Sequence, residues 1–309
     1  MHLLSIGATE NLEQIKERIL FEFKLLKEEE DVTVKSNEKK RGEFYFLNCS
    51  ILDEELLRNS FSNTVSMFRY HVANVLSDII ISKWEKKLID QIIKEHYYYF
   101  NEEEQKIIAK YSNRILNFDD VEGKNSYLYE TNRKTQVLHK ILEYLETNNQ
   151  IIIEGFIKFR LKDYISELED AVDRAVDEFL MEKEYKEFIK LLKYFVEIQE
   201  PKKDVIHVIL NSKGFKLYDI NMNQLNDDYL EDFTIEMAEN SMNYDDLLVS
   251  ALITIAPNKI IIHSSCPQNY KEALNTVKNI FDDRIMFCDG CEICKDKIDV
   301  KNHVDTQRL

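Results

Sequence analysis

Glycine and proline are scarce in this chain, with six glycines and three prolines among 309 residues. Sandwiches, barrels and collagen-like folds depend on frequent glycine and proline, so this composition disfavours them and favours long uninterrupted helices. Long apolar runs are also missing, since no window approaches the roughly 18 residues of a membrane span. The first residues lack the positive region and apolar run of a signal peptide. We therefore expect a cytoplasmic protein without a membrane span.

Positive charge is in deficit, because 41 lysines and arginines face 57 aspartates and glutamates, for a formal charge of −16. Such a chain repels phosphate backbones and gains no general attraction to anionic membranes. Nucleic acid is therefore not favoured as a partner, although a local basic face is compatible with the composition. A protein partner or self-association is the expected kind of interaction.

Familiar catalytic signatures are absent as well. The sequence contains no G-x-x-x-x-G-K-[ST], no G-x-G-x-x-G, no G-x-S-x-G and no H-E-x-x-H. The local motifs of several enzyme classes are therefore missing from it. A noncatalytic binding or scaffold role is the preferred prediction. The alternative is an enzyme, a hydrolase or a nucleic-acid-processing activity, with a site at the carboxyl edge of the C-terminal sheet, where α/β folds place ligands.

The first 52 residues predict a small β-α-β-β unit. Residues 3–6 have the pattern of a short strand, and apolar side chains recur every three or four positions over residues 12–26, as on an amphipathic helix. Residues 32–35 and 44–48 form a plausible strand pair, with a charged turn at residues 38–42.

Residues 53–200 predict a helical region without a convincing strand. Asn101 precedes three glutamates and is a candidate N-cap, because a side-chain oxygen and acidic residues satisfy the unpaired N–H groups of a first turn. Helical periodicity covers residues 64–94, 101–116, 131–145 and 151–198.

Residues 201–309 predict a third region, an α/β domain with a Cys-rich end. Two strands joined by Asn211-Ser212-Lys213-Gly214 suggest a hairpin. The predicted elements are strands at 205–210, 215–220, 259–263 and 284–287, and helices at 244–255 and 270–281. The last two strands enclose a helix, so they should be parallel and adjacent. The predicted fold class is α+β and mostly helical, with a helical middle region between a small N-terminal β-α-β-β unit and a C-terminal α/β domain whose sheet is partly parallel.

Cysteine usage points to one chemical feature. Five cysteines are an odd number, and three of them, Cys288, Cys291 and Cys294, lie within seven residues. This arrangement suits a reducing compartment better than a secreted disulfide framework. The C-x-x-C-x-x-C spacing lets three thiolates converge on one ion, and Gly290 helps the loop to turn.

Cys266 is the preferred fourth ligand of this predicted zinc site. It follows the predicted strand at 259–263, and Cys288 follows the strand at 284–287, so both should lie at the same edge of the sheet. His303 and His263 are the substitute ligands.

Three other interpretations of the cysteines stay open. They can be unligated thiols near a chain end, a redox-active C-x-x-C pair or sensor, or an iron–sulfur site. The last fits least well, because Cys294 is not followed by the Cys-Pro of the bacterial ferredoxin run. His207 and His263 lie in apolar strands, where a hydrogen-bonded core histidine is the commoner role than a catalyst.

Three segments carry a family resemblance that extends over most of the chain: residues 154–164 (EGFIKFRLKDY), 172–180 (VDRAVDEFL) and 184–196 (EYKEFIKLLKYFV). They resemble the YtxC-like family of endospore-forming bacteria, whose members are usually described as sporulation proteins. The resemblance implies a physiological setting but no mechanism. It transfers no catalytic or ligand residue to positions in this sequence.

Overall fold

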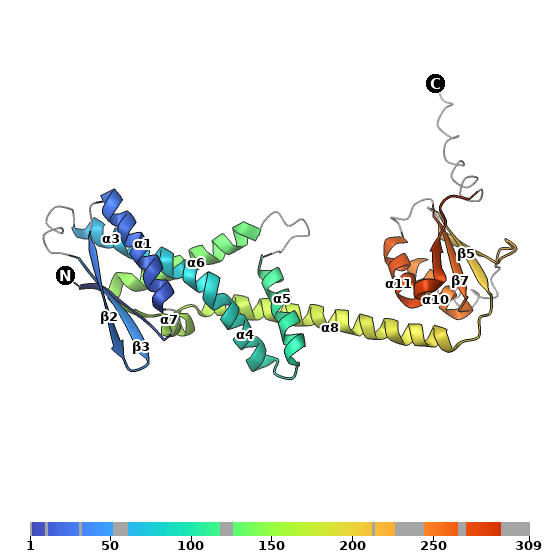
Figure 1. Ribbon diagram of the computed structural model, residues 1–309, viewed down its shortest axis with the longest axis horizontal. Helices are drawn as coiled ribbons and strands as arrows, with labels where there is room; N and C mark the ends of the chain where they lie inside the picture. Colours follow the sequence, from blue (N-terminus) through green and yellow to red (C-terminus); the bar gives the residue numbers. More distant parts are fainter. Residues whose placement is uncertain are drawn as a thin grey trace, which may run out of the picture. The chain divides into compact units, whose positions relative to one another are not determined.

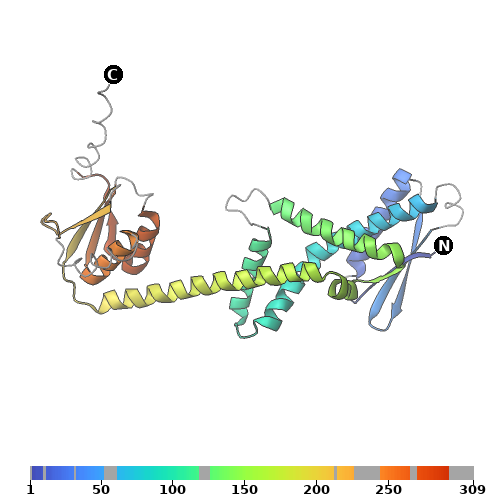
Figure 2. The same cartoon turned by 180° about the vertical axis from the view of Figure 1, so that it is seen from behind.

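A computed structural model describes residues 2–9, 12–30, 33–51, 61–117, 126–211, 214–225, 244–264 and 270–291. By backbone packing the chain forms two compact units, Met1–Met181 and Glu182–Leu309 (Figures 1 and 2). The division into three regions at residues 52 and 200 stays a prediction. None of the helices in the described part of the chain has the length and apolar character needed to cross a bilayer.

The sheet of unit 1 has the strand order β2-β3-β1-β4. Its strands are β1 His2–Ala8, β2 Val34–Arg41, β3 Phe44–Ile51 and β4 Gln150–Ile152. The predicted β-α-β-β unit is confirmed, but the turn was placed wrongly, since the charged residues before Gly42 continue β2. β2 is an edge strand, and exposed charges protect such an edge from pairing with other chains. The turn is at Gly42, whose φ of 63° is left-handed.

The expectation of no strand between residues 53 and 199 is wrong at β4. This three-residue strand pairs in parallel with β1, with Ser5 opposite Gln150 and Gly7 opposite Ile152. Ile151 and Ile152 directly precede a helix, and a short apolar run in that position has no period that separates strand from helix.

Helices supply most of unit 1. They are α1 Leu12–Glu30, α3 Phe61–Ile79, the π-helical turn η1 Ile80–Trp84, α4 Glu85–His96, α5 Glu102–Asn117, α6 Ser126–Thr147, α7 Ile153–Arg160 and the first part of α8 Lys162–Ile198. α3 contacts both α1 and α6 (Figure 1), and one hydrophobic core extends from β1 to Phe179 in α8. The predicted N-cap is confirmed, because Asn101 Oδ1 accepts from the N–H groups of Glu103 and Glu104 at 3.0 Å.

This core contains a buried polar cluster, Arg133 with Glu85 and Tyr164. Arg133 Nε and Nη2 donate to the two carboxylate oxygens of Glu85 at 3.0 and 3.2 Å. Arg133 also donates to the carbonyl of Leu116 at 2.7 Å and to Asn117 Oδ1 at 3.1 Å. The Tyr164 hydroxyl donates to Glu85 Oε2 at 2.8 Å. Burial, reinforced by the Glu85 charge, raises the pKa of Tyr164.

Unit 2 is built on a second sheet with the order β6-β5-β7-β8. It contains β5 Val205–Asn211, β6 Gly214–Tyr218, α10 Tyr244–Ile255, β7 Lys259–Ser264, α11 Lys271–Phe281, the 3-10 turn η4 Asp282–Arg284 and β8 Ile285–Phe287. β5 and β6 are antiparallel, whereas β5–β7 and β7–β8 are parallel. The predicted hairpin, the crossover and the fold class are therefore confirmed.

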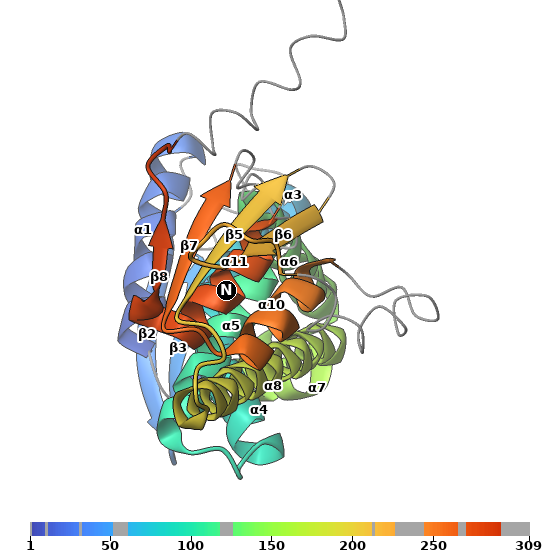
Figure 3. The same ribbon diagram turned by 90° about the vertical axis from the view of Figure 1, so that its right-hand side faces the viewer.

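One face of this sheet packs against helices and forms the core of unit 2 with them. Figure 3 shows the helices α10 and α11 beside this sheet. Alternate residues of β5 and β7, among them Ile206, Val208, Ile260 and Ile262, are buried with side chains of these helices. Strand side chains alternate between faces, so the residues between them, including His207 and His263, share the other face. Those two histidines belong to the candidate site.

Candidate metal centre

The carboxyl ends of β7 and β8 meet at one edge of the unit 2 sheet. Ile262 is opposite Phe287 in the parallel register, and the N–H of Cys288 donates to the carbonyl of Ile262 at 2.9 Å. This bond continues the ladder one residue beyond β8. It fixes the backbone of Cys288 beside the end of β7, where His263 follows Ile262.

Three possible metal ligands converge at this edge. One ligand atom from each of His263, Cys288 and Cys291 lies within 4.8 Å of the other two, and His263 Nδ1 is 3.5 Å from Cys291 Sγ. The imidazole is buried and both cysteines are half-buried. Gly290 has a φ of 114°, a value that residues with a Cβ rarely adopt, and it turns the chain between the two cysteines.

His207 lies behind His263 on the neighbouring strand. Its Nδ1 is 2.9 Å from His263 Nε2, so one ring nitrogen donates to the other, and the ring centroids are 5.2 Å apart. Burial lowers the pKa of His207, while Asp219 acts in the opposite direction. Partial burial thus favours a neutral His207 imidazole.

The two ring nitrogens of His263 therefore have different surroundings. Nε2 faces His207 and Nδ1 faces the thiol of Cys291. If Nε2 carries the proton and donates it to His207, the lone pair of Nδ1 is directed to the cysteines. A histidine that ligates a metal is usually held in this way, with its other nitrogen donating to a neighbouring group.

The donor set fits zinc. Zn–S bonds of about 2.3 Å and Zn–N bonds of about 2.0 Å put tetrahedral ligand atoms roughly 3.5–3.8 Å apart. The distance between His263 and Cys291 is already in this range, and movements of about 1 Å would bring in Cys288. Soft thiolates combined with imidazole also suit zinc better than magnesium or calcium.

The sequence-predicted residues divide into two groups. His263, a substitute ligand in the sequence analysis, lies with Cys288 and Cys291. Cys266, Cys294 and His303 lie outside the described residues, so the fourth ligand stays a prediction. His207 was not among the predicted ligands. Its place beside His263 depends on the β5–β7 register, in which Ile209 is opposite His263, and the strand patterns alone do not contain that offset.

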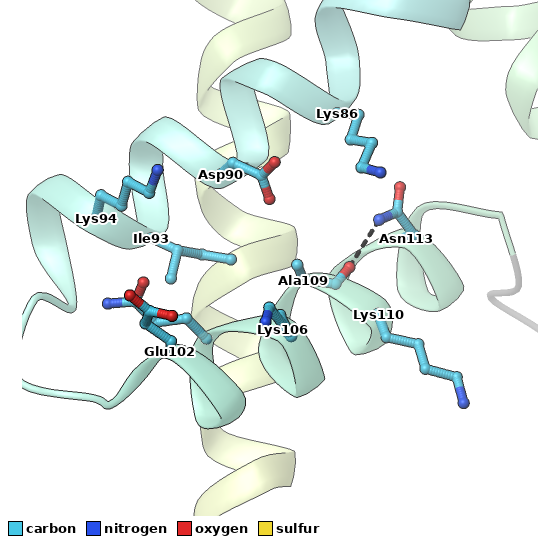
Figure 4. A pocket seen from close by; sticks show the side chains of 10 residues that line it. Lys86, Asp90, Ile93, Lys94, Glu102, Lys106, Ala109, Lys110 and Asn113 are labelled. Atoms are coloured by element: carbon cyan, nitrogen blue, oxygen red, sulfur yellow. Dashed lines mark hydrogen bonds between the residues drawn. The ribbon is translucent and has the colours of Figure 1, made fainter.

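A groove between α4 and α5 in unit 1 is a second concave surface, with a volume of about 790 Å³ (Figure 4). Four lysines, Lys86, Lys94, Lys106 and Lys110, line it together with the carboxylates of Asp90 and Glu102. Asp90 lies between Lys86 and Lys94 on α4, and Glu102 lies one turn before Lys106 on α5. Charges of both signs thus alternate along the groove, as on a solvated helix pair, and the thiol–imidazole cluster is the chemically more specific site.

The fold and this cluster together define a mostly helical α+β protein with cysteine and histidine side chains at the edge of a partly parallel sheet. The YtxC-like family matches residues 70–286, and the chain belongs to that family. It is 25% identical over 205 residues to an uncharacterized protein, YtxC of Bacillus subtilis (strain 168), covering 63% of this chain and 68% of that protein. No solved structure matches this chain.

The family match includes both histidines and ends two residues before Cys288. The match therefore includes His263 but neither cysteine, and family membership assigns no metal-binding role to any of them. Only the positions of the side chains indicate a metal.

Proposed function

We propose that this chain is a noncatalytic binding protein whose C-terminal unit is stabilised by a zinc ion held by His263, Cys288 and Cys291. One observation carries the proposal: three donor atoms of the types that zinc prefers lie within 4.8 Å of one another. Cys266 or Cys294 would complete a closed site with four protein ligands. Closed four-ligand zinc sites are structural, whereas catalytic sites keep one position open to water.

Metal analysis of untagged full-length protein tests this proposal. We expect about one zinc per chain after purification without chelator. Zinc below about 0.2 per chain, even after reconstitution, would overturn the proposal. Cobalt substitution adds an independent readout, because thiolate-to-cobalt charge-transfer bands report sulfur ligation and tetrahedral geometry.

Variants locate the ion. Cys291→Ala should abolish stoichiometric zinc binding, because it removes a thiolate that the remaining ligands cannot replace. Cys49→Ala is the matched control, since Cys49 is buried in the core of unit 1 and should retain zinc. Equal zinc contents in the two variants would place the ion elsewhere.

His207 would act as a positioning residue for the same centre. Its Nδ1 is 2.9 Å from His263 Nε2 and can hold the tautomer whose Nδ1 binds metal. His207→Phe should weaken zinc binding about 10–100-fold, and His207→Asn, which retains an acceptor near the place of Nδ1, should restore part of the affinity. If neither variant changes the affinity while both remain folded, His207 has no such role.

A thiol-based redox sensor is the second candidate, because the same geometry brings Cys288 and Cys291 together. Neither cysteine is in a disulfide in the described residues, and a C-x-x-C pair can oxidise to one. Zinc bound to both thiolates would block that disulfide. Partner binding that is unchanged after full oxidation and reduction of the metal-free protein would remove the sensor candidate.

We also propose a cellular setting for the protein, on the basis of its family. We place the protein in the cytoplasm of a sporulating cell, as the YtxC-like resemblance and the odd number and clustering of its cysteines suggest. A clean deletion of its gene should lower the yield of heat-resistant spores, and re-expression should restore it. Normal sporulation after deletion would contradict this setting without affecting the zinc proposal.

A further inference from the structure

The last turns of α8 expose a row of large apolar side chains in unit 2. The α8 stripe consists of Phe188, Leu191, Tyr194, Phe195 and Ile198, each between 50% and 67% exposed. Isolated apolar residues are common on protein surfaces, but five of them on about three successive turns form a contiguous patch. Such a patch marks an interaction surface more often than a solvated helix face.

The opposite side of the same turns is already packed on unit 2. Ile189 and Val196 are buried in its core. The Tyr185 hydroxyl lies 3.2 Å from Thr276 Oγ1, and Lys193 donates to Asp282 at 3.0 Å. The α8 stripe is therefore a second apolar face that the described residues of unit 2 do not cover.

Four residues of the stripe, together with Glu184 one turn before them, have the spacing of a coiled-coil seam. Residues 184, 188, 191, 195 and 198 are separated by four, three, four and three positions, which is the alternation that keeps one side of a helix facing a partner helix. Four of these five positions are apolar, and Glu184 is the exception. The occupant that fits is therefore another α-helix.

The area is sufficient for a dimer of two such helices. Side chains of this size carry about 150–250 Å² when extended, so exposure near one half leaves about 100 Å² on each. Five residues then offer about 500 Å² per copy, and a pair would bury about 1,000 Å², which is the lower limit for a specific interface.

The neutral charge of this segment makes it a better place for a second copy to bind than the acidic remainder of the surface. The chain carries −16 overall, and copies of it should repel each other across most of their surfaces. Residues 182–198 are neutral, with four glutamates and four lysines: Glu182, Glu184, Glu187, Glu197, Lys183, Lys186, Lys190 and Lys193. Two copies can therefore meet along this segment without net repulsion.

We infer that two copies of this chain associate through the α8 stripe as an antiparallel helix pair. In a parallel pair in register, Glu184 would face Glu184 at a seam position, and like charges there are unfavourable. In an antiparallel pair, each Glu184 lies near the far end of the partner's seam. The two-fold relation uses the same surface on both copies, as in most homodimers.

Sedimentation equilibrium of the full-length protein tests the inference. We expect about twice the chain mass of 36.8 kDa, with dissociation at low micromolar concentration or below. Leu191→Glu should weaken self-association at least about tenfold. Ile220→Glu is the matched control, because Ile220 is also in unit 2 and 62% exposed but lies outside the stripe.

Circular dichroism and zinc content establish that both variants remain folded. A wild-type protein that stays monomeric up to about 100 µM would overturn the inference, as would equal weakening by both variants. A photo-crosslinking residue at position 198 reports orientation. Links to the turn around Glu184 support the antiparallel pair, and links between the two copies of position 198 contradict it. Loss of zinc in Cys291→Ala tests the metal proposal separately, since Cys291 is not part of the stripe.

Discussion

Each unit contains a polar cluster in or beside its core, and the two clusters differ in their burial and in the chemistry of their members. In unit 1, Arg133, Glu85 and Tyr164 are all buried, and Arg133 is bonded through all three of its guanidinium nitrogens. In unit 2, Cys288 and Cys291 are half-buried beside His263 at a sheet edge. The first cluster is closed, whereas the second presents donor atoms to a shared point.

The difference separates a structural cluster from a candidate binding site. A buried charge is tolerated when partners satisfy it, so the Arg133 cluster is explained by its own hydrogen bonds and needs no ligand. Thiols and an imidazole directed at one point are not explained by mutual hydrogen bonding in the same way, because sulfur is a weak donor and acceptor. Zinc is a cation that would bind all three donor atoms at one point.

The largest effect should come from breaking the closed cluster. Arg133→Met leaves the Glu85 carboxylate buried without its cation and should lower the free energy of unfolding of unit 1 by about 3–5 kcal/mol. Urea unfolding followed by fluorescence measures this, because Trp84, the single tryptophan of the chain, is next to Glu85. Combining Arg133→Met with Glu85→Leu should recover part of the loss. A loss below about 1 kcal/mol in the single variant would show that the cluster is not closed as described.

Zinc should have the next largest effect, confined to unit 2. At a free concentration about 100 times its dissociation constant, a ligand of the native state adds about 2.7 kcal/mol to the free energy of unfolding. Hydrogen exchange read by mass spectrometry should therefore slow in β7 and β8 and remain unchanged in α3. Cys291→Ala should lose the protection. Slower hydrogen exchange in both units, or in neither, would contradict a zinc site whose effect is confined to unit 2.

Tyr164→Phe should have a smaller effect on unit 1, about 2 kcal/mol, because Glu85 loses one hydrogen bond but retains Arg133. The pKa of Tyr164 is raised by burial, so the neutral form is favoured in the folded state. Its contribution is fully present below the unfolded pKa of about 10 and falls as the pH rises above it. The stability of the wild type should therefore decline more steeply above pH 10 than that of Tyr164→Phe, and parallel declines would contradict this assignment.

Local patterns were sufficient to predict most of unit 2. The strands at 205–210 and 259–263 and the helix at 244–255 were predicted within a residue of their observed bounds. The helix between the last two predicted strands then indicated that β7 and β8 are parallel neighbours. The predicted position of Cys288 at the carboxyl edge of the sheet follows from that pairing.

Features set by tertiary packing escaped prediction. The π-helical turn Ile80–Trp84 and the break at Leu161 between α7 and α8 interrupt stretches whose apolar periodicity continues. His263 was predicted only as a substitute ligand, because its position beside Cys291 depends on the strand register and on the turn at Gly290, neither of which is contained in residue spacing. The apolar residues of the α8 stripe were expected on a helix, but periodicity does not tell an internal face from an external one.

The smallest effect concerns thiol reactivity rather than stability, and it compares the two units directly. Burial raises the pKa of the Cys49 thiol to about 12, so at pH 8 only about one molecule in 10,000 carries the reactive thiolate. Cys288 and Cys291 are half-buried and should react with iodoacetamide in metal-free protein while Cys49 does not. Peptide mapping by mass spectrometry measures each site.

Alkylation of the zinc-bound protein is the control for this comparison. Bound metal should protect Cys288 and Cys291 from alkylation, because a ligating thiolate is a poorer nucleophile than a free one, and it should leave Cys49 as unreactive as before. Denaturation should make Cys49 react like the others, since its low reactivity comes from burial alone. If Cys49 reacts in the folded protein as fast as Cys291, the core of unit 1 opens more readily than its packing indicates.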